Sequence, residues 1–289
     1  MARYDKFIPE LWSASIQRNL EKLHVFAEDC NRQYEGDVKG PGDTVHILGA
    51  AKPTITTITR ANANNELPVP EELDGTEQLL TINQMSYFNY MVGDIDKAQS
   101  VDTLMDSLTQ ETAEGMADAM DKYISSKVMD ATKLNSAAQQ VTAANILNML
   151  DTAIQTLYEK NVKPTTELVI TVSPRFYTLF KQAYIDKDTN NSAIMKNGKV
   201  GMYGNVTVKM SNNVHRTTGT ATAFSATGEI DNIMIRTKRA VAFVNPFTHT
   251  EPYRPEKHFA DAIKGYSVYD AKIIRPDEIL NMNVKYTAS

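Results

Sequence analysis

The chain has 289 residues, a formal net charge of -5, 42% hydrophobic residues and 22% charged residues. These values predict one large folded domain or two smaller ones, and they exclude a fibre or a largely disordered chain. The acidic balance argues against a dedicated nucleic-acid-binding protein, because such proteins carry a basic surplus that displaces counterions from phosphates. Nonspecific contact with DNA remains compatible with it.

The single cysteine, Cys30, cannot form a disulfide within the chain and has no partner at metal-ligand spacing. We interpret it as a buried or incidental thiol. The amino terminus lacks a continuous apolar core, which argues against a secretory signal, and no later apolar run reaches membrane-spanning length. We therefore expect synthesis and folding in the cytoplasm, without contact with a membrane.

The amino-terminal part predicts a helix followed by a break. Apolar residues at helical spacing indicate an irregular amphipathic helix within residues 10–30. Glycines and a proline within 36–42 end this helix and begin extended chain.

Two long strands follow, and their length is informative. Alternating and β-branched residues predict one strand from Thr44 to about Arg60 and a second from Thr76 to Val92. The stretch "NANNELPVPEELDG", residues 62–75, is then the tip of a β-hairpin. The first strand alone would extend about 50 Å, whereas a compact chain of this size has a radius of gyration of about 19 Å. Because an isolated two-stranded ribbon is marginally stable, the hairpin must lie on another molecule or domain.

The rest of the chain alternates between helices and strands. Apolar spacing predicts a long helix over 101–133 and a shorter one over 142–160, with Asn161 as its stop. A buried strand, "ELVITV", then runs into a Ser-Pro pair that caps the next helix, "PRFYTLFKQAY". Further strands are predicted within "VTVKMSNNV", "DNIMIRTKRAVAFVN" and "GYSVYDAKIIRP". The pattern indicates an α+β fold with a carboxyl-terminal half that is mainly sheet.

Charged side chains on these elements are interpreted as surface. The acids of the long helix are assigned to its solvated face; they include Asp106, Glu111, Glu114, Asp118 and Asp121. A short basic cluster, Arg236, Lys238 and Arg239, could meet phosphate, but such a cluster on a strand is usually exposed surface.

Two stretches carry residue types found in functional sites. The stretch "NGKVGMYGN", residues 197–205, lacks the Ser or Thr that follows the lysine of a phosphate loop, so turn glycines explain it better. The stretch "HTEPYRPEKH", residues 249–258, gathers two histidines and two glutamates, but its prolines exclude the helical spacing of a metalloprotease motif. An exposed polar strand or loop is the preferred interpretation, and a soluble metal-dependent enzyme is kept as an alternative. We predict no catalytic residue, no cofactor and no metal site.

The order of the parts resembles the major capsid proteins of tailed bacteriophages, which have the Hong Kong 97-type coat fold. The resemblance begins with an amino-terminal arm, the glycine-marked hairpin, the link "VGDIDKAQS" and the long helix. It continues through "ELVITVSPRFYTLF", "GKVGMYGNVTVKMSNNV" and "AVAFVNPFTHTEPYRPEKHFADAIKGYSVYDAKIIRPDEI" and covers nearly the whole chain.

The resemblance implies a division of the chain into an arm, an extended hairpin, a spine helix, and axial and peripheral domains. The expected boundaries are 1–42 for the arm, 43–93 for the hairpin, 94–139 for the spine helix and peripheral domain, 140–245 for the axial domain, and 246–289 for returning strands.

The resemblance also implies a function. The expected protein is a structural component of the virion that assembles in the host cytoplasm, through hexamers and pentamers, into an icosahedral head around double-stranded DNA. Its partners would be further copies of itself, a portal and a separate scaffolding protein, since the arm begins almost at Met1. A tail-tube subunit is the other virion component considered.

In the family that the chain resembles, the hairpin lies across a neighbouring subunit. The expected inter-subunit contacts of this chain are therefore the polar residues of the hairpin tip, which are Asn62, Asn64, Asn65, Glu66, Glu71, Glu72 and Asp74. Some family members form lysine–asparagine crosslinks, but residue types alone predict none here.

Overall fold

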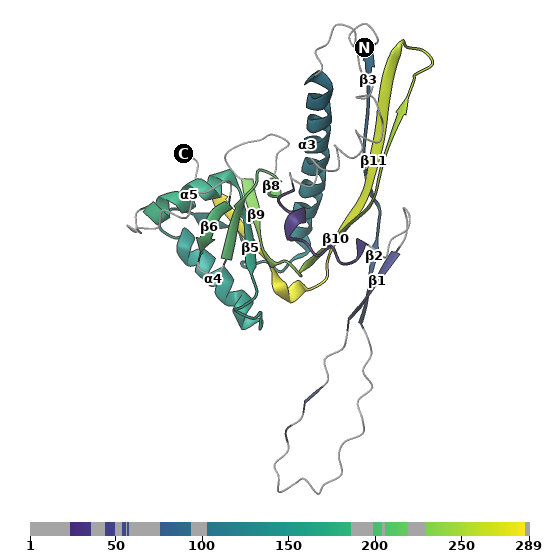
Figure 1. Ribbon diagram of the computed structural model, residues 1–289. Coiled ribbons are helices and arrows are strands. Elements are labelled where there is room, and N and C mark those ends of the chain that lie inside the picture. Colours follow the sequence, from purple (N-terminus) through teal and green to yellow (C-terminus); the bar gives the residue numbers. More distant parts are fainter. Residues whose placement is uncertain are drawn as a thin grey trace, which may run out of the picture.

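The computed structural model describes residues 24–35, 44–49, 54, 55, 57, 76–93, 103–185, 199–203, 206–218 and 229–286. Its described part combines a compact half, made of a mixed sheet with two helices, and an elongated half, in which a long helix runs beside a long narrow sheet (Figure 1). The predicted α+β class is confirmed.

The sheet of the compact half has seven strands in the order β4-β12-β9-β5-β7-β6, with β8 paired to β9. The pairs β4–β12 and β5–β7 are parallel and the others are antiparallel. The strands are β4 (Gln139–Val141), β5 (Leu168–Val172), β6 (Lys199–Tyr203), β7 (Val206–Met210), β8 (Arg216–Thr218), β9 (Glu229–Thr237) and β12 (Ile279–Tyr286).

Helices α4 (Ile146–Glu159) and α5 (Pro174–Ile185) pack their apolar sides on this sheet. Asn161, predicted as the stop of the first helix, has a φ of 66°, a left-handed conformation that asparagine tolerates better than most residues. Ser173 caps the second helix as predicted, because the Phe176 N–H donates to its Oγ at 3.3 Å. Local signals therefore fixed these elements well.

The sheet of the elongated half has the order β10-β11-β3 and is antiparallel. Its strands are β3 (Gln84–Gly93), β10 (Val241–Tyr253) and β11 (Ala260–Ile273), and the helix beside them is α3 (Thr103–Ser126). Gly265 of β11 is required by packing, because a Cβ there would lie 2.4 Å from the ring of Phe88.

A short 3-10 turn, η5 (Lys127–Asp130), continues the chain beyond α3, so the predicted helix over 101–133 is wrong at its end. Val128 of that turn is buried, which is why the apolar spacing seemed to extend the helix. The predicted helix within 10–30 also fails where it can be tested: of 24–30, only η2 (Ala27–Asp29) is helical, and residues 1–23 lie outside the described part.

The first predicted hairpin strand forms β1 (Thr44–Gly49), and the described residues 54, 55 and 57 are not in a strand; 50–53, 56 and 58–60 lie outside the described part. The second predicted strand is interrupted: β2 (Thr76–Thr81) is separated from β3 by a break at Ile82 and Asn83. A further 3-10 turn, η7 (Pro276–Glu278), joins β11 to β12.

The two halves meet around residues 24–31, and two predictions of exposed charge are wrong there. Asp121 is buried, and its carboxylate accepts the N–H groups of Val25 and Phe26 at 2.8 and 3.3 Å. Arg236 is fully buried and donates to the Phe26 carbonyl at 2.6 Å and to Cys30 Sγ at 3.1 Å. Buried charges persist where several hydrogen bonds satisfy them, and those partners lie far away in the sequence.

Cys30 is confirmed as a buried free thiol. Burial raises its pKa, and the Arg236 guanidinium opposes that change only in part. The thiol therefore stays protonated, and it donates to the Phe26 carbonyl at 3.2 Å.

Candidate functional site at the root of the hairpin

The hairpin leaves the body through a short paired root. Strands β1 and β2 pair from Thr44 opposite Thr81 to Gly49 opposite Thr76. Residues 50–75 connect them, a stretch far longer than the roughly two to five residues of an ordinary hairpin turn. Ile55, in that connection, is 88% exposed. The root therefore holds a connection of unusual length, in which the described residue Ile55 is exposed to solvent.

One face of the root is buried against the long sheet. Alternation along the strands places Val45, Ile47 and Leu80 on this face, together with Ile82 from the break that follows β2. They pack on Val244 of β10 and on Val268 of β11. Burial of an aliphatic side chain of this size stabilises a fold by about 1.5–3 kcal/mol. The root is thus anchored by apolar packing on the body.

Asp270 of β11 ties the hairpin to the long helix. Its Oδ1 accepts the hydroxyl of Tyr123, on α3, at 2.8 Å and the N–H of Ala271 at 2.6 Å. Its Oδ2 accepts the N–H of Asn83, in the break between β2 and β3, at 3.3 Å. One carboxylate therefore connects the helix, the long sheet and the bend from which the hairpin departs.

The electrostatics of this tie fix which group holds the proton. Burial, followed by the Asp270 carboxylate, raises the pKa of Tyr123 well above its usual value of 10.0. The phenol is therefore protonated at neutral pH and donates its hydrogen bond to Asp270.

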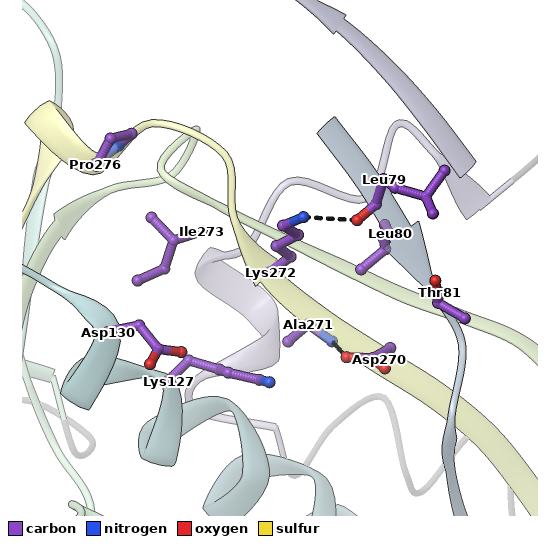
Figure 2. Close-up of a pocket in the computed structure, with 10 residues that line it drawn as sticks. All are labelled: Leu79, Leu80, Thr81, Lys127, Asp130, Asp270, Ala271, Lys272, Ile273 and Pro276. Atoms are coloured by element: carbon purple, nitrogen blue, oxygen red, sulfur yellow. Dashed lines mark hydrogen bonds between the residues drawn. The ribbon is translucent and has the colours of Figure 1, made fainter. Parts of the chain in front are cut away.

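Two further hydrogen bonds hold the same root from its edge. Lys272 Nζ donates to the Leu79 carbonyl at 2.6 Å, as drawn in Figure 2. Gln78 Nε2 donates to the Ile274 carbonyl at 3.2 Å. Asp270, Lys272 and Ile274 are therefore alternate residues along β11 and its continuation. All three bind β2 or the bend that follows it.

A depression of about 500 Å³ opens beside this root, between β2, β11 and the end of the long helix (Figure 2). Lys127 and Asp130 from η5 line it opposite Leu79 and Lys272. The other face of the root is exposed, and there His46 of β1 pairs with Glu77 of β2. The root therefore combines a fixed side and an accessible side.

The predicted tip contacts cannot be placed. Asn62, Asn64, Asn65, Glu66, Glu71, Glu72 and Asp74 all lie outside the described residues. The same is true of residues 197, 198, 204 and 205 of the phosphate-loop-like stretch, whose middle forms β6.

The histidine and glutamate group at 249–258 lies where it was predicted, on an exposed strand and turn. His249 is 4.0 Å from Glu251 on β10, and Glu251 is 3.3 Å from Lys264 of β11. Among the described residues, no three His, Cys, Asp or Glu side chains form a group that could hold a metal ion. None of the described helices is long and apolar enough to cross a membrane.

Sequence reasoning missed Asp270 and Tyr123 as the residues that fix the root. A weak signal existed, because Asp270 interrupts the apolar residues of "GYSVYDAKII". A charged residue inside a buried strand indicates a satisfied polar tie. Its partner Tyr123 is 147 residues away, and no pattern in the sequence identifies it.

Comparison with known proteins places this architecture. A family described as phage capsid protein matches residues 92–281. A structure titled "Mycobacterium phage Che8" is 23% identical, with a TM-score of 0.70 over 89% of this chain and 90% of the other. The capsid structure of the cyanophage P-SCSP1u is 14% identical, with a TM-score of 0.64 over 87% and 85% of the two chains.

A third structure, the mature capsid of bacteriophage PhiM1, is 16% identical, with a TM-score of 0.62 over 92% of this chain and 88% of the other. The search of curated proteins found no match. The structural matches confirm the predicted Hong Kong 97-type fold class.

Proposed function

Because the chain belongs to the phage capsid protein family, as a major capsid protein and virion component, we propose that its copies assemble through hexamers and pentamers into an icosahedral head. This head encloses the double-stranded DNA of the phage. The role is structural rather than catalytic.

The fixed root is the observation that carries the proposal. Its base is fixed by four buried apolar side chains and by the Asp270 tie, whereas Ile55 beyond the base is 88% exposed. An extension that is rigidly held at one end and exposes an apolar side chain gains stability when a second copy covers it. Contacts of this kind, repeated around a ring, close into capsomers, and many modest contacts together stabilise a shell.

The remaining partners follow from the same role. A separate scaffolding protein guides assembly in the host cytoplasm, a portal occupies one vertex, and the DNA is touched without specificity. The acidic net charge of -5 suits the last point, because packaged DNA must be enclosed without tight binding. The proposed division into arm, hairpin, spine helix, axial domain and returning strands keeps the boundaries expected from the sequence.

Electron microscopy and light scattering of the purified full-length chain, with and without its scaffolding protein, test the assembly proposal. We expect capsomers or closed shells of uniform size. A chain that stays monomeric in every assembly condition would contradict it.

A sharper test concerns the hairpin tip. Reversing charge with Glu71→Lys and Glu72→Lys should reduce the yield of shells, since tip acids are proposed to meet basic residues of a neighbour. Glu159→Lys, at an exposed position on α4, is the matched control and should leave the yield unchanged. Equal yields from tip and control variants would show that the tip acids make no assembly contact.

A further inference from the structure

The outer edge of the long sheet borders an open groove. Strand β3 pairs with β11 on one side, and no strand of the described residues pairs with it on the other. A groove of about 440 Å³ lies between this edge and α3. Met85, Tyr87 and Phe88 line it from the strand, and Glu111, Gly115 and Met116 line it from the helix.

The strand side of the groove is apolar and exposed. Met85 is 60% exposed and Tyr87 is 75% exposed, although both belong to β3 of the long sheet. The free edge also presents backbone N–H and C=O groups without a strand partner, and natural proteins usually cover such an edge. The groove therefore offers both apolar contact and backbone hydrogen bonds to an added segment.

Gly115 is the second, independent feature. It lies within α3, where glycine lowers helix stability relative to alanine. Packing among the described residues does not require it, because a Cβ at this position would meet none of their atoms within 4 Å. Absence of a side chain here instead leaves room for a backbone to approach the helix closely.

We infer that residues 1–23 of the same chain occupy this groove. This segment carries apolar residues for the strand side, including Phe7, Ile8 and Trp12. It also has four basic residues against three acidic ones, whereas 50–75 has two against four. Since Glu111 is exposed on α3 at the groove and Glu114 is exposed on the same helix, the more basic segment is the better electrostatic match.

The path of the chain permits this arrangement. The described chain starts at His24, and the neighbouring N–H of Val25 is held on α3 by Asp121 at 2.8 Å. Asp121 and Gly115 are six residues apart on α3, which is about 120° around the helix, so the segment passes around part of a cylinder of about 10 Å diameter. A stretch of 23 extended residues spans about 75 Å, which is ample for that path.

Photocrosslinking in the full-length chain tests the inference. Replacing Tyr87 with p-benzoylphenylalanine and irradiating the protein should give crosslinks to peptides from 1–23, identified by mass spectrometry. The same probe at Phe259, which is 89% exposed and remote from the groove, is the control and should not give them. Crosslinks from Tyr87 to 50–75, or to no segment of the chain, would overturn the inference.

Two additions identify the chain and the role of the glycine. In a mixture of copies labelled with ¹⁴N and ¹⁵N, crosslinks should join peptides of one label, and mixed-label crosslinks would overturn the assignment to the same chain.

Gly115→Gln should leave the helix folded but reduce the crosslink yield several-fold. Lys122→Gln, at an exposed position on the same helix, is the matched control and should leave that yield unchanged; an undiminished yield from Gly115→Gln would mean that no backbone passes there.

Discussion

The two halves of the subunit differ in what they leave uncovered. In the compact half, α4 and α5 pack on the sheet, and the apolar side chains between them are almost fully buried within the subunit, as for Leu150 of α4 and Phe176 of α5. In the elongated half, α3 covers one face of the long sheet, while Met91 on β3 stays 55% exposed. The compact half is therefore stabilised by its own contacts, and the elongated half keeps apolar surface for other segments or copies.

Truncating one apolar side chain in each half, one buried and one exposed, tests this difference most strongly. Leu150→Ala, in the compact half, should lower the free energy of unfolding by about 2–5 kcal/mol, because it removes buried apolar surface and leaves a cavity. Met91→Ala should change it by no more than about 0.5 kcal/mol. Urea unfolding of the unassembled chain, followed by circular dichroism, measures both values.

A similar loss for the two variants would contradict the comparison, since it would mean that Met91 is already buried in the free subunit. In an assembly assay, the half that matters more should be the elongated one. Met91→Ala should reduce the yield of shells more than a conservative core change in the compact half, such as Ile170→Val.

The sequence predicted the compact half better than the elongated half for a physical reason. The boundaries of α4, β5 and α5 depend on neighbouring residues, such as Asn161 and Ser173, so local pattern was sufficient. The break between β2 and β3 depends on Asp270, which is 187 residues from Asn83 along the chain. Strand propensity alone could not predict it.

The buried charged residues show the same limit of prediction from local sequence. Arg236 and Asp121 were assigned to the surface because charged side chains usually are. Their partners are backbone groups of 25–27 and the Cys30 thiol, up to 210 residues away. The hairpin itself was predicted from length and alternation, yet the residues that hold its root required the fold.

The Asp270 tie allows a second test, at the buried root of the hairpin in the elongated half. Asp270→Asn should lower the free energy of unfolding by about 1–3 kcal/mol, because hydrogen bonds to a charged acceptor are lost or weakened. Tyr123→Phe should cost about 1 kcal/mol, since it removes one donor and leaves the bond to the Asn83 N–H. Amide hydrogen exchange at Asn83 should accelerate strongly in the first variant and weakly in the second.

Tyr87→Phe is the matched control, because it removes a hydroxyl from an exposed tyrosine of the neighbouring strand. It should leave both stability and Asn83 exchange unchanged. If Asp270→Asn gave the same exchange rate as the original chain, Asp270 would not be the residue that fixes the bend.

The smallest expected effect comes from an exposed ion pair at the seam between the halves. Lys238 Nζ lies 3.0 Å from Glu167 Oε2, and the hydrogen bond from Lys238, followed by that from Thr207, lowers the pKa of Glu167 below its usual 4.5. A lowered carboxyl pKa contributes stability that is full above about pH 4.5 and is lost as pH falls through the folded-state value. Because both side chains are about half exposed, Lys238→Met should cost only about 0.2–1 kcal/mol at pH 7. The difference in unfolding free energy between Lys238→Met and the original chain should shrink as the pH falls below 4.5. Denaturant unfolding over a pH series measures it. A cost that stayed constant across the series would assign the effect to lost side-chain packing.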